Sequence, residues 1–441
     1  MKGDFSRDTF NAFKHFSRLL MQQGRVQLDA DWNEQASISA HYLRTLAADL
    51  IGPHGGPRDG FKISRIPADT GQPLMDLAIA GGHYYVAGLL CEHLAAVGNQ
   101  GAAATYWTQR DYPVGKDAGA LPQAPFLVYL DVWERHITVV EDPGILEPAL
   151  GGADTCTRVQ VVWQVKAMPL SPPTTDATGK RLTRLWRESA EEALRLAVPC
   201  KATMRARAYS GTGSGGSGTT SGEGAAYRGI ENRLYRVEIH DGGDSAPSFK
   251  WSRANGSVVF PIAKIFDTAV QVGRPDDLEL KLRCGDWVEV ADDDAVLLWR
   301  TAPLLQVQAI DPSTGMVTLS GKPSVDESSP ASKHPLLRRW EGWQPVRKTS
   351  DTGSMDWQEL EDGVQVQFGA AGAFSTGDYW LIPARVATGD VIWPNDNGTP
   401  SPTALPPAGV EHHFAPLSVL LPQQSGGVLP LDLRRVFKPL V

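Results

Sequence analysis

The sequence predicts a mainly β fold, in which an N-terminal helical hairpin precedes two or three β-sandwich or barrel-like units. Three observations support this class. Helical spacing of apolar residues marks residues 1–57, short runs with period-two alternation follow, and 441 residues exceed the length over which one hydrophobic core usually keeps growing. We therefore expect a docking hairpin at residues 1–57, β domains at 58–170, 226–327 and 328–441, and a helix with a linker at 171–225.

The first helix of the predicted hairpin is short. Phe13, Phe16 and Leu20 are three and four residues apart, which places them on one helical face. Gly24 can end this helix because glycine adopts the left-handed conformation without steric cost.

The second helix of the hairpin has clear start and stop signals. Asp31 suits the N-cap, and Glu34 can reach back to the amide of the cap. An apolar stripe then runs from Trp32 to Leu50, and Gly52 with Pro53 ends the helix. A hairpin of this size cannot bury both stripes alone, so it docks either on the body of its own chain or on a neighbouring subunit. In the second case Arg7, Arg18, Arg25 and Trp32 would contact the neighbour.

Strand patterns begin after residue 57. Residues 83–91 read as one strand or as two short strands that bend at Gly88, and residues 126–133 carry one charge in eight positions, which predicts a strand covered on both faces. Residues 158–166 alternate apolar and polar side chains, which predicts a half-exposed strand. A helix at 181–196 and a Gly/Ser-rich tract at 210–224 follow, and the tract should behave as a flexible linker.

The second β block contains the strongest turn signal of the chain. Apolar and polar residues alternate at residues 235–240, which predicts a strand, and Asn255-Gly256 lies between two β-prone runs, as in a tight hairpin. Short strands at 286–290, 304–310 and 316–319 suggest a small barrel or sandwich. The third block adds strands at 364–368 and 378–382.

Composition excludes several classes of function. The chain has 42 basic and 50 acidic residues, a net charge of −8, and no basic block long enough to follow a phosphate backbone, so we expect no nucleic-acid partner. No apolar run approaches the roughly 18 residues of a membrane span, and the N-terminus lacks a signal-peptide pattern, which predicts synthesis and folding in the cytoplasm. The four cysteines are widely spaced, and we expect them to be buried free thiols.

Candidate chemical sites all have a plain structural alternative. Asp131 with Glu134, or Glu141 with Asp142, could form the carboxylate pair of a glycoside hydrolase, although a chain with 50 acidic residues offers many such pairs. Residues 292–294, three consecutive aspartates that follow Asp286, could offer oxygens to a cation or form a solvated turn. We predict no catalytic residue, no metal site and no cofactor.

Tryptophan is concentrated in the last 105 residues. These side chains could be core, or they could be anchors at a protein interface or stacking faces for sugar rings. The predicted interaction residues of this block are Trp340, Trp343, Trp357, Trp380 and Trp393.

Seven segments of the sequence are distinctive. The first three are MKGDFSRDTF at residues 1–10, LMQQGRVQLDADWNEQ at 20–35 and DLIGPHGGP at 49–57. The others are YLDVWERH at 129–136, YRGIENRLYRVEIH at 227–240, FKWSRANGSV at 249–258 and GDYWLIPAR at 377–385. Together these segments resemble an uncharacterised bacterial protein family whose genes are often found with those of phage-tail-like contractile injection systems.

The resemblance implies a component of a particle. We expect a non-enzymatic structural or adaptor subunit at the baseplate, fibre or outer surface of such a particle, which binds other particle subunits. A homo-oligomer is also expected, since repeated particle parts usually have closed symmetry. Assembly would follow synthesis in the cytoplasm, into a kind of particle that cells can release. The alternative from a different class is a glycan-binding or glycan-cleaving protein that acts on cell-wall polysaccharide.

Overall fold

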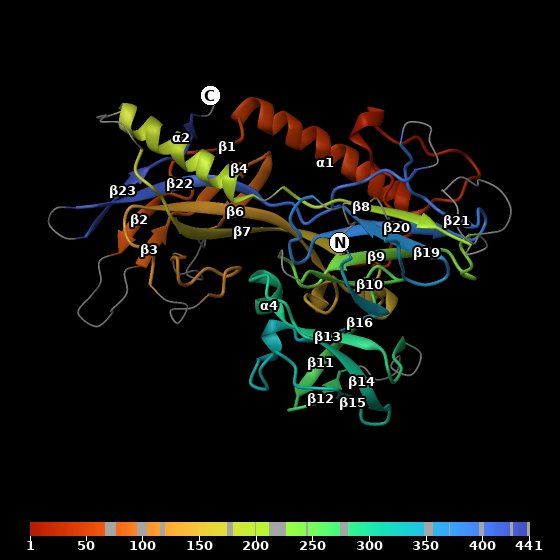
Figure 1. The fold of residues 1–441 in the computed structure, drawn as a ribbon. Coiled ribbons are helices and arrows are strands. Elements are labelled where there is room, and N and C mark those ends of the chain that lie inside the picture. The colour runs from red at the N-terminus through yellow and green to blue at the C-terminus, as the bar shows by residue number, and fades with distance from the viewer. Residues whose placement is uncertain are drawn as a thin grey trace.

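The computed structural model describes residues 1–66, 76–94, 104–114, 120–173, 180–198, 200–210, 226–243, 246–273, 281–347, 356–369, 371–396, 401–423 and 427–438. The chain is mainly β, with 39% strand and 16% helix, which confirms the predicted class. Its strands form three β-bodies, which we call the first sheet body, the second sheet body and the barrel (Figure 1).

The first sheet body is built on a four-stranded antiparallel sheet with the order β23-β22-β6-β7. Its strands are β6 (Phe126–Ile137), β7 (Arg158–Pro169), β22 (His413–Pro422) and β23 (Val428–Asp432). Two smaller sheets, β24-β1-β4-β5 and β2-β3, cover one face. Their strands are β1 (His54–Pro57), β2 (Ile63–Ile66), β3 (Asp76–Ile79), β4 (Gly82–Val86), β5 (Leu89–His93) and β24 (Val436–Phe437). Helix α2 (Lys180–Ala197) covers the other face, and the 3-10 turns η3 (Pro143–Ile145) and η4 (Pro148–Leu150) lie between β6 and β7.

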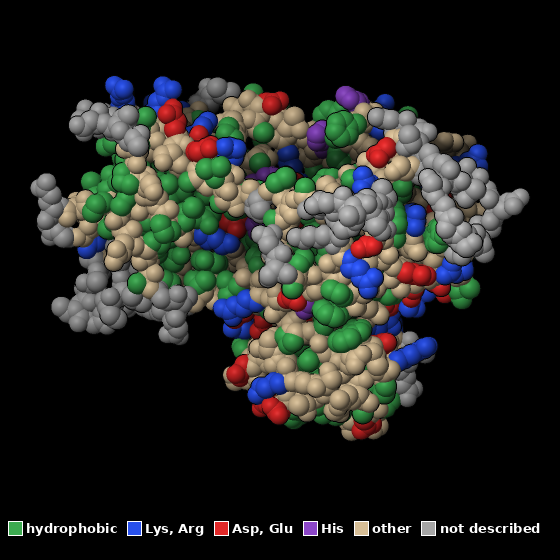
Figure 2. Space-filling model, in the orientation of Figure 1, with side chains coloured by type: hydrophobic (Ala, Val, Ile, Leu, Met, Phe, Trp, Pro, Cys, Tyr) green, Lys and Arg blue, Asp and Glu red, His purple; other side chains and the backbone are tan. Residues whose placement is uncertain are grey.

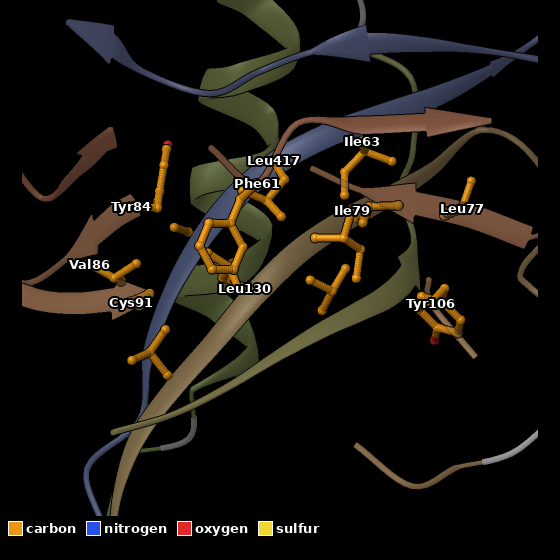
Figure 3. Packing of buried hydrophobic residues seen from close by; sticks show 14 of the residues in the cluster. Phe61, Ile63, Leu77, Ile79, Tyr84, Val86, Cys91, Tyr106, Leu130 and Leu417 are labelled. Atoms are coloured by element: carbon orange, nitrogen blue, oxygen red, sulfur yellow. The ribbon is translucent and has the colours of Figure 1, made fainter. Parts of the chain in front are cut away.

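Alternate side chains of β6 enter two different cores. Val128 and Leu130 pack with Phe61 and Tyr84 of the smaller sheets, as Figure 3 shows for part of this cluster. Leu127 packs against Trp186 of α2 on the opposite face. The prediction that both faces of this strand are covered is therefore confirmed, because side chains alternate across a strand.

The second sheet body packs a five-stranded sheet, β17-β10-β9-β20-β21, against a three-stranded sheet, β18-β19-β8. The five strands are β9 (Arg233–Ile239), β10 (Ser248–Ser252), β17 (Gly342–Pro345), β20 (Tyr379–Arg385) and β21 (Asp390–Val391). The three strands are β8 (Met204–Ala208), β18 (Gln358–Glu359) and β19 (Val364–Phe368). Both sheets combine segments from different predicted domains, so the expected boundaries at residues 225 and 327 do not separate the sheets.

The barrel is closed by six strands in the order β11-β12-β15-β14-β13-β16 and projects below the sheet bodies in Figure 1. Its strands are β11 (Val259–Ile265), β12 (Ala269–Val272), β13 (Trp287–Ala291), β14 (Leu304–Asp311), β15 (Met316–Leu319) and β16 (Leu336–Trp340). The short helices α4 (Asp293–Leu297) and η6 (Ala331–Lys333) belong to the same stretch. Strands 286–290, 304–310 and 316–319 predicted a small barrel or sandwich, and the structure shows the barrel.

The chain enters the barrel at the predicted turn, but the turn is not a hairpin. Asn255 and Gly256 have φ angles of 51° and 65°, as the sequence signal requires. However, β10 pairs with β9 and β17, whereas β11 pairs with β12 and β16. The turn therefore transfers the chain from one sheet to another, since the strands on either side find their partners elsewhere.

The prediction of an N-terminal helical hairpin is wrong for its first helix. Only η1 (Ala12–Lys14) is helical between residues 1 and 28, and the second predicted helix forms as α1 (Asp29–Ile51). Helix α1 begins two residues before the predicted N-cap, and Asp31 instead accepts a hydrogen bond from the Leu28 amide at 3.2 Å. It ends at Gly52, with φ of 91°, as predicted.

Strand β7 is partly exposed, as predicted, but β7 and β9 both bury polar side chains. In β9, Arg236 and Glu238 are buried together with the apolar residues of the strand. In β7, Gln164 is buried because the barrel covers it, and its amide donates to the Leu297 carbonyl oxygen at 2.8 Å. The alternation separated the two faces of each strand, but it could not show that another part of the chain covers the polar face.

The cysteines are free, as predicted, but only Cys91 is buried. Cys156, Cys200 and Cys284 are exposed, so the expectation of four buried thiols is wrong for three of them. Residues 211–224 of the predicted tract at 210–224 lie outside the described residues, and the predicted helix at 181–196 is confirmed as α2.

A buried histidine joins the first sheet body to α2. His54 Nδ1 lies 3.0 Å from the Tyr84 hydroxyl, and His54 Nε2 lies 3.2 Å from Glu191. The Tyr84 oxygen accepts from the Arg435 amide, so its proton is available to Nδ1, and a neutral ring with its proton on Nε2 satisfies both contacts. Burial, assisted by the Arg435 charge, lowers the pKa of His54 to about 4 despite the opposing effect of Glu191.

This arrangement predicts an acid-sensitive fold. The unfolded chain takes up a proton at His54 near the usual pKa of about 6.5, whereas the folded chain resists protonation down to about pH 4, so stability is complete above pH 6.5 and falls as the pH decreases toward 4. The slope contributed by this residue is up to about 1.4 kcal/mol per pH unit. Urea unfolding at several pH values gives the free energy of unfolding as a function of pH. Between pH 4 and 6.5 this free energy should change less steeply in His54→Gln than in the wild-type protein. The matched control His83→Gln, at an exposed site of β4, should keep the wild-type pH dependence. Equal slopes in all three proteins would contradict this account.

Candidate functional site

Helix α1 is attached to the body of the protein along a narrow stripe. Only Ala30, Glu34 and Ile38 are buried, and their four-residue spacing places them on one face. Near the other end, Arg44 forms a bidentate ion pair with Glu134 of β6, with distances of 2.6 and 3.1 Å. Gly88 lies so close to this helix that a Cβ there would be 2.2 Å from the Arg44 carbonyl oxygen. The helix is thus held firmly, with most of its circumference uncovered.

The segment before α1 runs along the helix with few contacts. The Leu19 amide donates to the Gln35 side chain at 2.8 Å, and the Thr9 hydroxyl donates to Glu34. From residue 11 to residue 29 every residue except Leu19 is exposed. The segment therefore adds surface to the helix rather than covering it.

These two elements expose large apolar side chains in unusual number. Figure 2 shows hydrophobic and histidine side chains on the upper edge of the molecule, where Figure 1 places α1. Eleven such residues are at least 48% exposed, and we call them the apolar docking surface: Phe13, Phe16, Leu20, Met21, Val26, Leu28, Trp32, Tyr42, Leu43, Leu46 and Leu50. Side chains of this size at these exposures present roughly 1,000 Å² or more, compared with about 300–600 Å² for the largest apolar patch of a typical monomer.

A small cavity lies between the segment and the helix. Its volume is about 220 Å³, and Phe10, Phe16, Ile38 and Tyr42 contribute to its lining. This volume suits one or two inserted side chains rather than a drug-sized ligand, for which pockets of about 300–1,000 Å³ are usual. The cavity is therefore a small hollow in the exposed surface formed by the segment and the helix.

Residues 1–6 anchor the docking surface to the second sheet body and the turn that leads into the barrel. The amide of Asn255 donates to the carbonyl oxygens of Met1, at 3.1 Å, and Gly3, at 2.8 Å. Arg385 donates to the Ser6 carbonyl oxygen at 2.8 Å. Asn255 is fully buried, so these bonds replace hydration that its amide cannot obtain.

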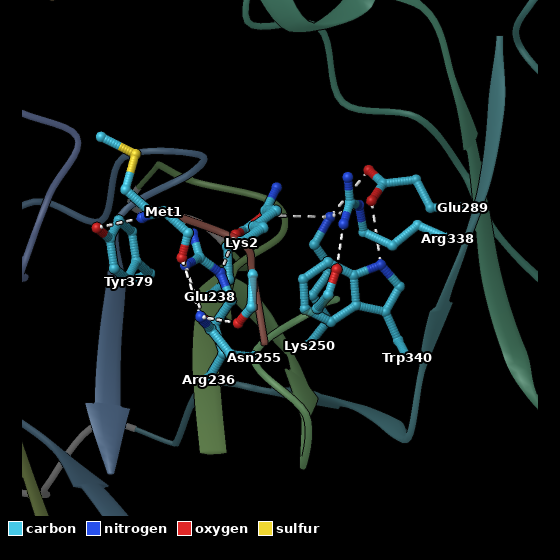
Figure 4. A network of polar contacts seen from close by, with 12 residues as sticks. Met1, Lys2, Arg236, Glu238, Lys250, Asn255, Glu289, Arg338, Trp340 and Tyr379 are labelled. Atoms are coloured by element: carbon cyan, nitrogen blue, oxygen red, sulfur yellow. Dashed lines mark hydrogen bonds and ion pairs between the residues drawn. The ribbon is translucent and has the colours of Figure 1, made fainter. Parts of the chain in front are cut away.

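A buried ionic cluster surrounds this anchor (Figure 4). Glu238 lies 3.0 Å from Lys2, 2.6 Å from Arg236 and 3.5 Å from Lys250. Lys250 also pairs with Glu289 of the barrel at 2.8 Å. Burial by itself would raise the pKa of Glu238, but the neighbouring cations outweigh it and hold the pKa well below its usual value.

The cluster holds more cations than carboxylates. Burial, with help from Arg236 and Lys250, lowers the pKa of Lys2 to about 8, against the opposing effect of Glu238. Aromatic faces supply part of the missing negative potential: Arg236 lies 3.6 Å from the Tyr379 ring centroid, and Lys250 lies 4.5 Å from that of Trp340. Sequence reasoning missed this cluster, because Arg236 and Glu238 alternate with apolar residues as they would in a solvated strand.

The predicted interaction residues divide into exposed and core positions. Arg18, Arg25 and Trp32 are exposed, with Trp32 at 78%, and Arg7 is half-buried. In the C-terminal block the core alternative holds for Trp340 and Trp380, which are buried. Trp357 and Trp393 are half-buried: Trp357 stacks on Arg207, and Trp393 donates to the Thr403 carbonyl oxygen at 2.9 Å. Trp343 is 40% exposed.

The carboxylates considered for catalysis or cation binding have partners within the chain. Asp131 accepts from Lys166 at 2.6 Å and lies 2.7 Å from His412, while Glu134 binds Arg44.

The aspartates of residues 292–294 are paired as well. Asp292 caps α4, Asp293 binds Arg135 and His334, and Asp294 binds Lys333. Across the described ranges no group of three or more His, Cys, Asp or Glu side chains is arranged to hold a metal ion.

The ionic cluster predicts a strong dependence of stability on Glu238. Glu238→Gln leaves the buried Arg236 and Lys250 and the half-buried Lys2 without their shared carboxylate, and loss of one partner of a buried ion pair typically costs about 3–5 kcal/mol. Glu359→Gln removes an exposed ion pair with Arg228 and should cost at most about 1 kcal/mol. Urea unfolding followed by tryptophan fluorescence measures both. Similar losses for the two variants would show that the cluster is not a principal source of stability.

The comparison with known proteins gives a family without an assigned function. A model for a family of unknown function, DUF6519, matches residues 1–182 and 201–427. No curated protein matches the chain. None of the described helices is long and apolar enough to cross a membrane. Because the match spans most of the sequence, including the docking surface and the ionic cluster, the chain belongs to the DUF6519 family.

Proposed function

We propose that this protein is a non-enzymatic structural or adaptor subunit of a phage-tail-like contractile injection particle, attached at its baseplate, fibre or outer surface. The observation that carries the docking role is the apolar docking surface on α1 and the segment before it. Exposed patches larger than a few hundred Å² usually mark an interaction site. A stable protein interface buries about 800 Å² on each partner, which this surface can supply.

The manner of attachment also favours a docking role. Anchors at residues 1–6 and at Arg44 fix both ends of the surface, so binding costs little ordering of the backbone. Trp32 and Tyr42 are the residue types most often found as energetic anchors of interfaces.

The kind of particle depends on the resemblance of residues 1–10, 20–35 and 49–57 to a family whose genes accompany those of contractile injection systems. Two of these segments overlap the docking surface, which lies within residues 13–50. The docking role stands on the surface itself, whereas the particle assignment depends on the resemblance.

The test is co-purification from the native host at native expression level, with negative-stain microscopy and mass spectrometry. Wild-type protein should be recovered with sheathed, tail-like particles. Leu43→Asp/Leu46→Asp should be recovered alone, because two charges would be buried in the interface. These side chains are 68% and 57% exposed, so the variant should keep its fold, as circular dichroism can verify.

The matched control is Ile230→Asp, which changes a 90% exposed residue far along the chain and should remain with the particles. Substitutions are preferable to deletion of residues 1–57, since β1 pairs with both β4 and β24. Recovery of wild-type protein without particles would overturn the particle assignment. Retention of the double variant on particles would overturn the docking role of α1.

A further inference from the structure

We infer that the partner on the apolar docking surface is a second copy of this chain, related by a two-fold axis. This inference rests on the proposal that the docking surface is an interface, and it names the occupant. Its basis is a separation of charge between the two elements of the surface, considered together with the exposed apolar area.

The segment before α1 is basic. Residues 11–28 contain Lys14, Arg18 and Arg25 and no acidic residue, and all three cations are exposed. Among the described residues no ion pair joins any of the three to a carboxylate. Three exposed cations on an apolar strip therefore remain available to a partner.

Helix α1 is acidic on its available surface. Its charged residues are Asp29, Asp31, Glu34, Arg44 and Asp49. Glu34 is buried beside Thr9, and Arg44 is neutralised by Glu134, so the three aspartates determine the charge that a partner meets. The helix thus presents three negative charges beside Trp32, Leu43, Leu46 and Leu50, and the segment presents three positive charges beside its own apolar residues.

This pattern is self-complementary. In a two-fold interface the same patch meets itself in reverse, so the basic segment of one copy lies against the acidic helix of the other, and each contact occurs twice. A neutral apolar partner would leave six charges poorly solvated at the interface, and a partner of one sign would be repelled by one half of the surface. A second copy satisfies both halves with the exposed area already on the chain.

The cavity between the elements supports the same arrangement. It opens between the basic segment and the acidic helix and is lined mainly by apolar and aromatic side chains. Phe13, which follows the lining residue Ala12 in the sequence, is 91% exposed. An aromatic side chain from the second copy fits the size of such a pocket.

The decisive experiment is charge reversal followed by mixing. The basic-reversed variant is Lys14→Glu/Arg18→Glu/Arg25→Glu, and the acidic-reversed variant is Asp31→Lys/Asp49→Lys. Asp29 is left intact because it accepts from the Ser6 amide at 2.8 Å, and Asp31→Ala controls for loss of the hydrogen bond that Asp31 accepts from the Leu28 amide at 3.2 Å. Each variant by itself should repel its own copy in both halves of the interface. In an equimolar mixture both halves become attractive again, so a heterodimer should form.

Sedimentation velocity of the full-length proteins measures the outcome. Wild-type protein should dimerise, each variant should dissociate at least tenfold more readily, and the mixture should recover the dimer. The matched control is Arg184→Glu/Arg195→Glu on the exposed face of α2, which should remain dimeric. Circular dichroism should show the same helix content in every protein.

Each outcome decides one of the two proposals. A wild-type monomer at all concentrations, or a mixture that stays monomeric, overturns the second-copy inference. If the wild-type protein is monomeric but Leu43→Asp/Leu46→Asp still loses the particles, the docking role stands and the partner is a different subunit. If the dimer and its rescue are observed but no particle is recovered, the two-fold interface stands and the particle assignment fails.

Discussion

One buried carboxylate, that of Glu238, joins the parts of this protein. It binds cations from the N-terminus and from two strands of the second sheet body, and one of those cations, Lys250, also binds Glu289 of the barrel. Charges removed from water need fixed partners, so these elements must be in place together. The aromatic faces of Tyr379 and Trp340 complete the cluster. The barrel and the N-terminus are thereby coupled to the same sheet.

The position of the docking surface depends on this anchor. Residues 1–6 are fixed by Asn255 and Arg385, α1 is fixed by Arg44, and the chain between them is left on the outside. A helix with only three buried residues would be marginal by itself, so its anchors stabilise it more than its own packing does. The result is an apolar surface displayed on a firm support, which is what an assembly subunit requires.

The body of the protein uses its polar residues internally. Asp131 lies between Lys166 and His412, and Asp293 joins Arg135 of the first sheet body to His334 of the barrel. Asp131 thus stabilises the first sheet body from within, and Asp293 joins that body to the barrel. Residues 11–51, in contrast, expose apolar side chains and separated charges. Polar residues that pair inside the body and apolar residues that are exposed at 11–51 are consistent with the proposed docking role.

The sequence by itself determined what depends on local preferences. Period-two alternation indicated β6, β7, β9 and β19, the 3.6-residue period indicated α2 and α1, and Asn255-Gly256 indicated a turn with positive φ angles. In residues 13–28, Met21 lies off the stripe of Phe16 and Leu20, so the apolar side chains do not all follow one face. The tertiary structure alone decided which strands pair across the turn, that Arg236 and Glu238 are buried, and that Trp340 is core while Trp32 is exposed. These outcomes depend on contacts between residues far apart in the chain, and local sequence patterns do not determine the free energy of such contacts.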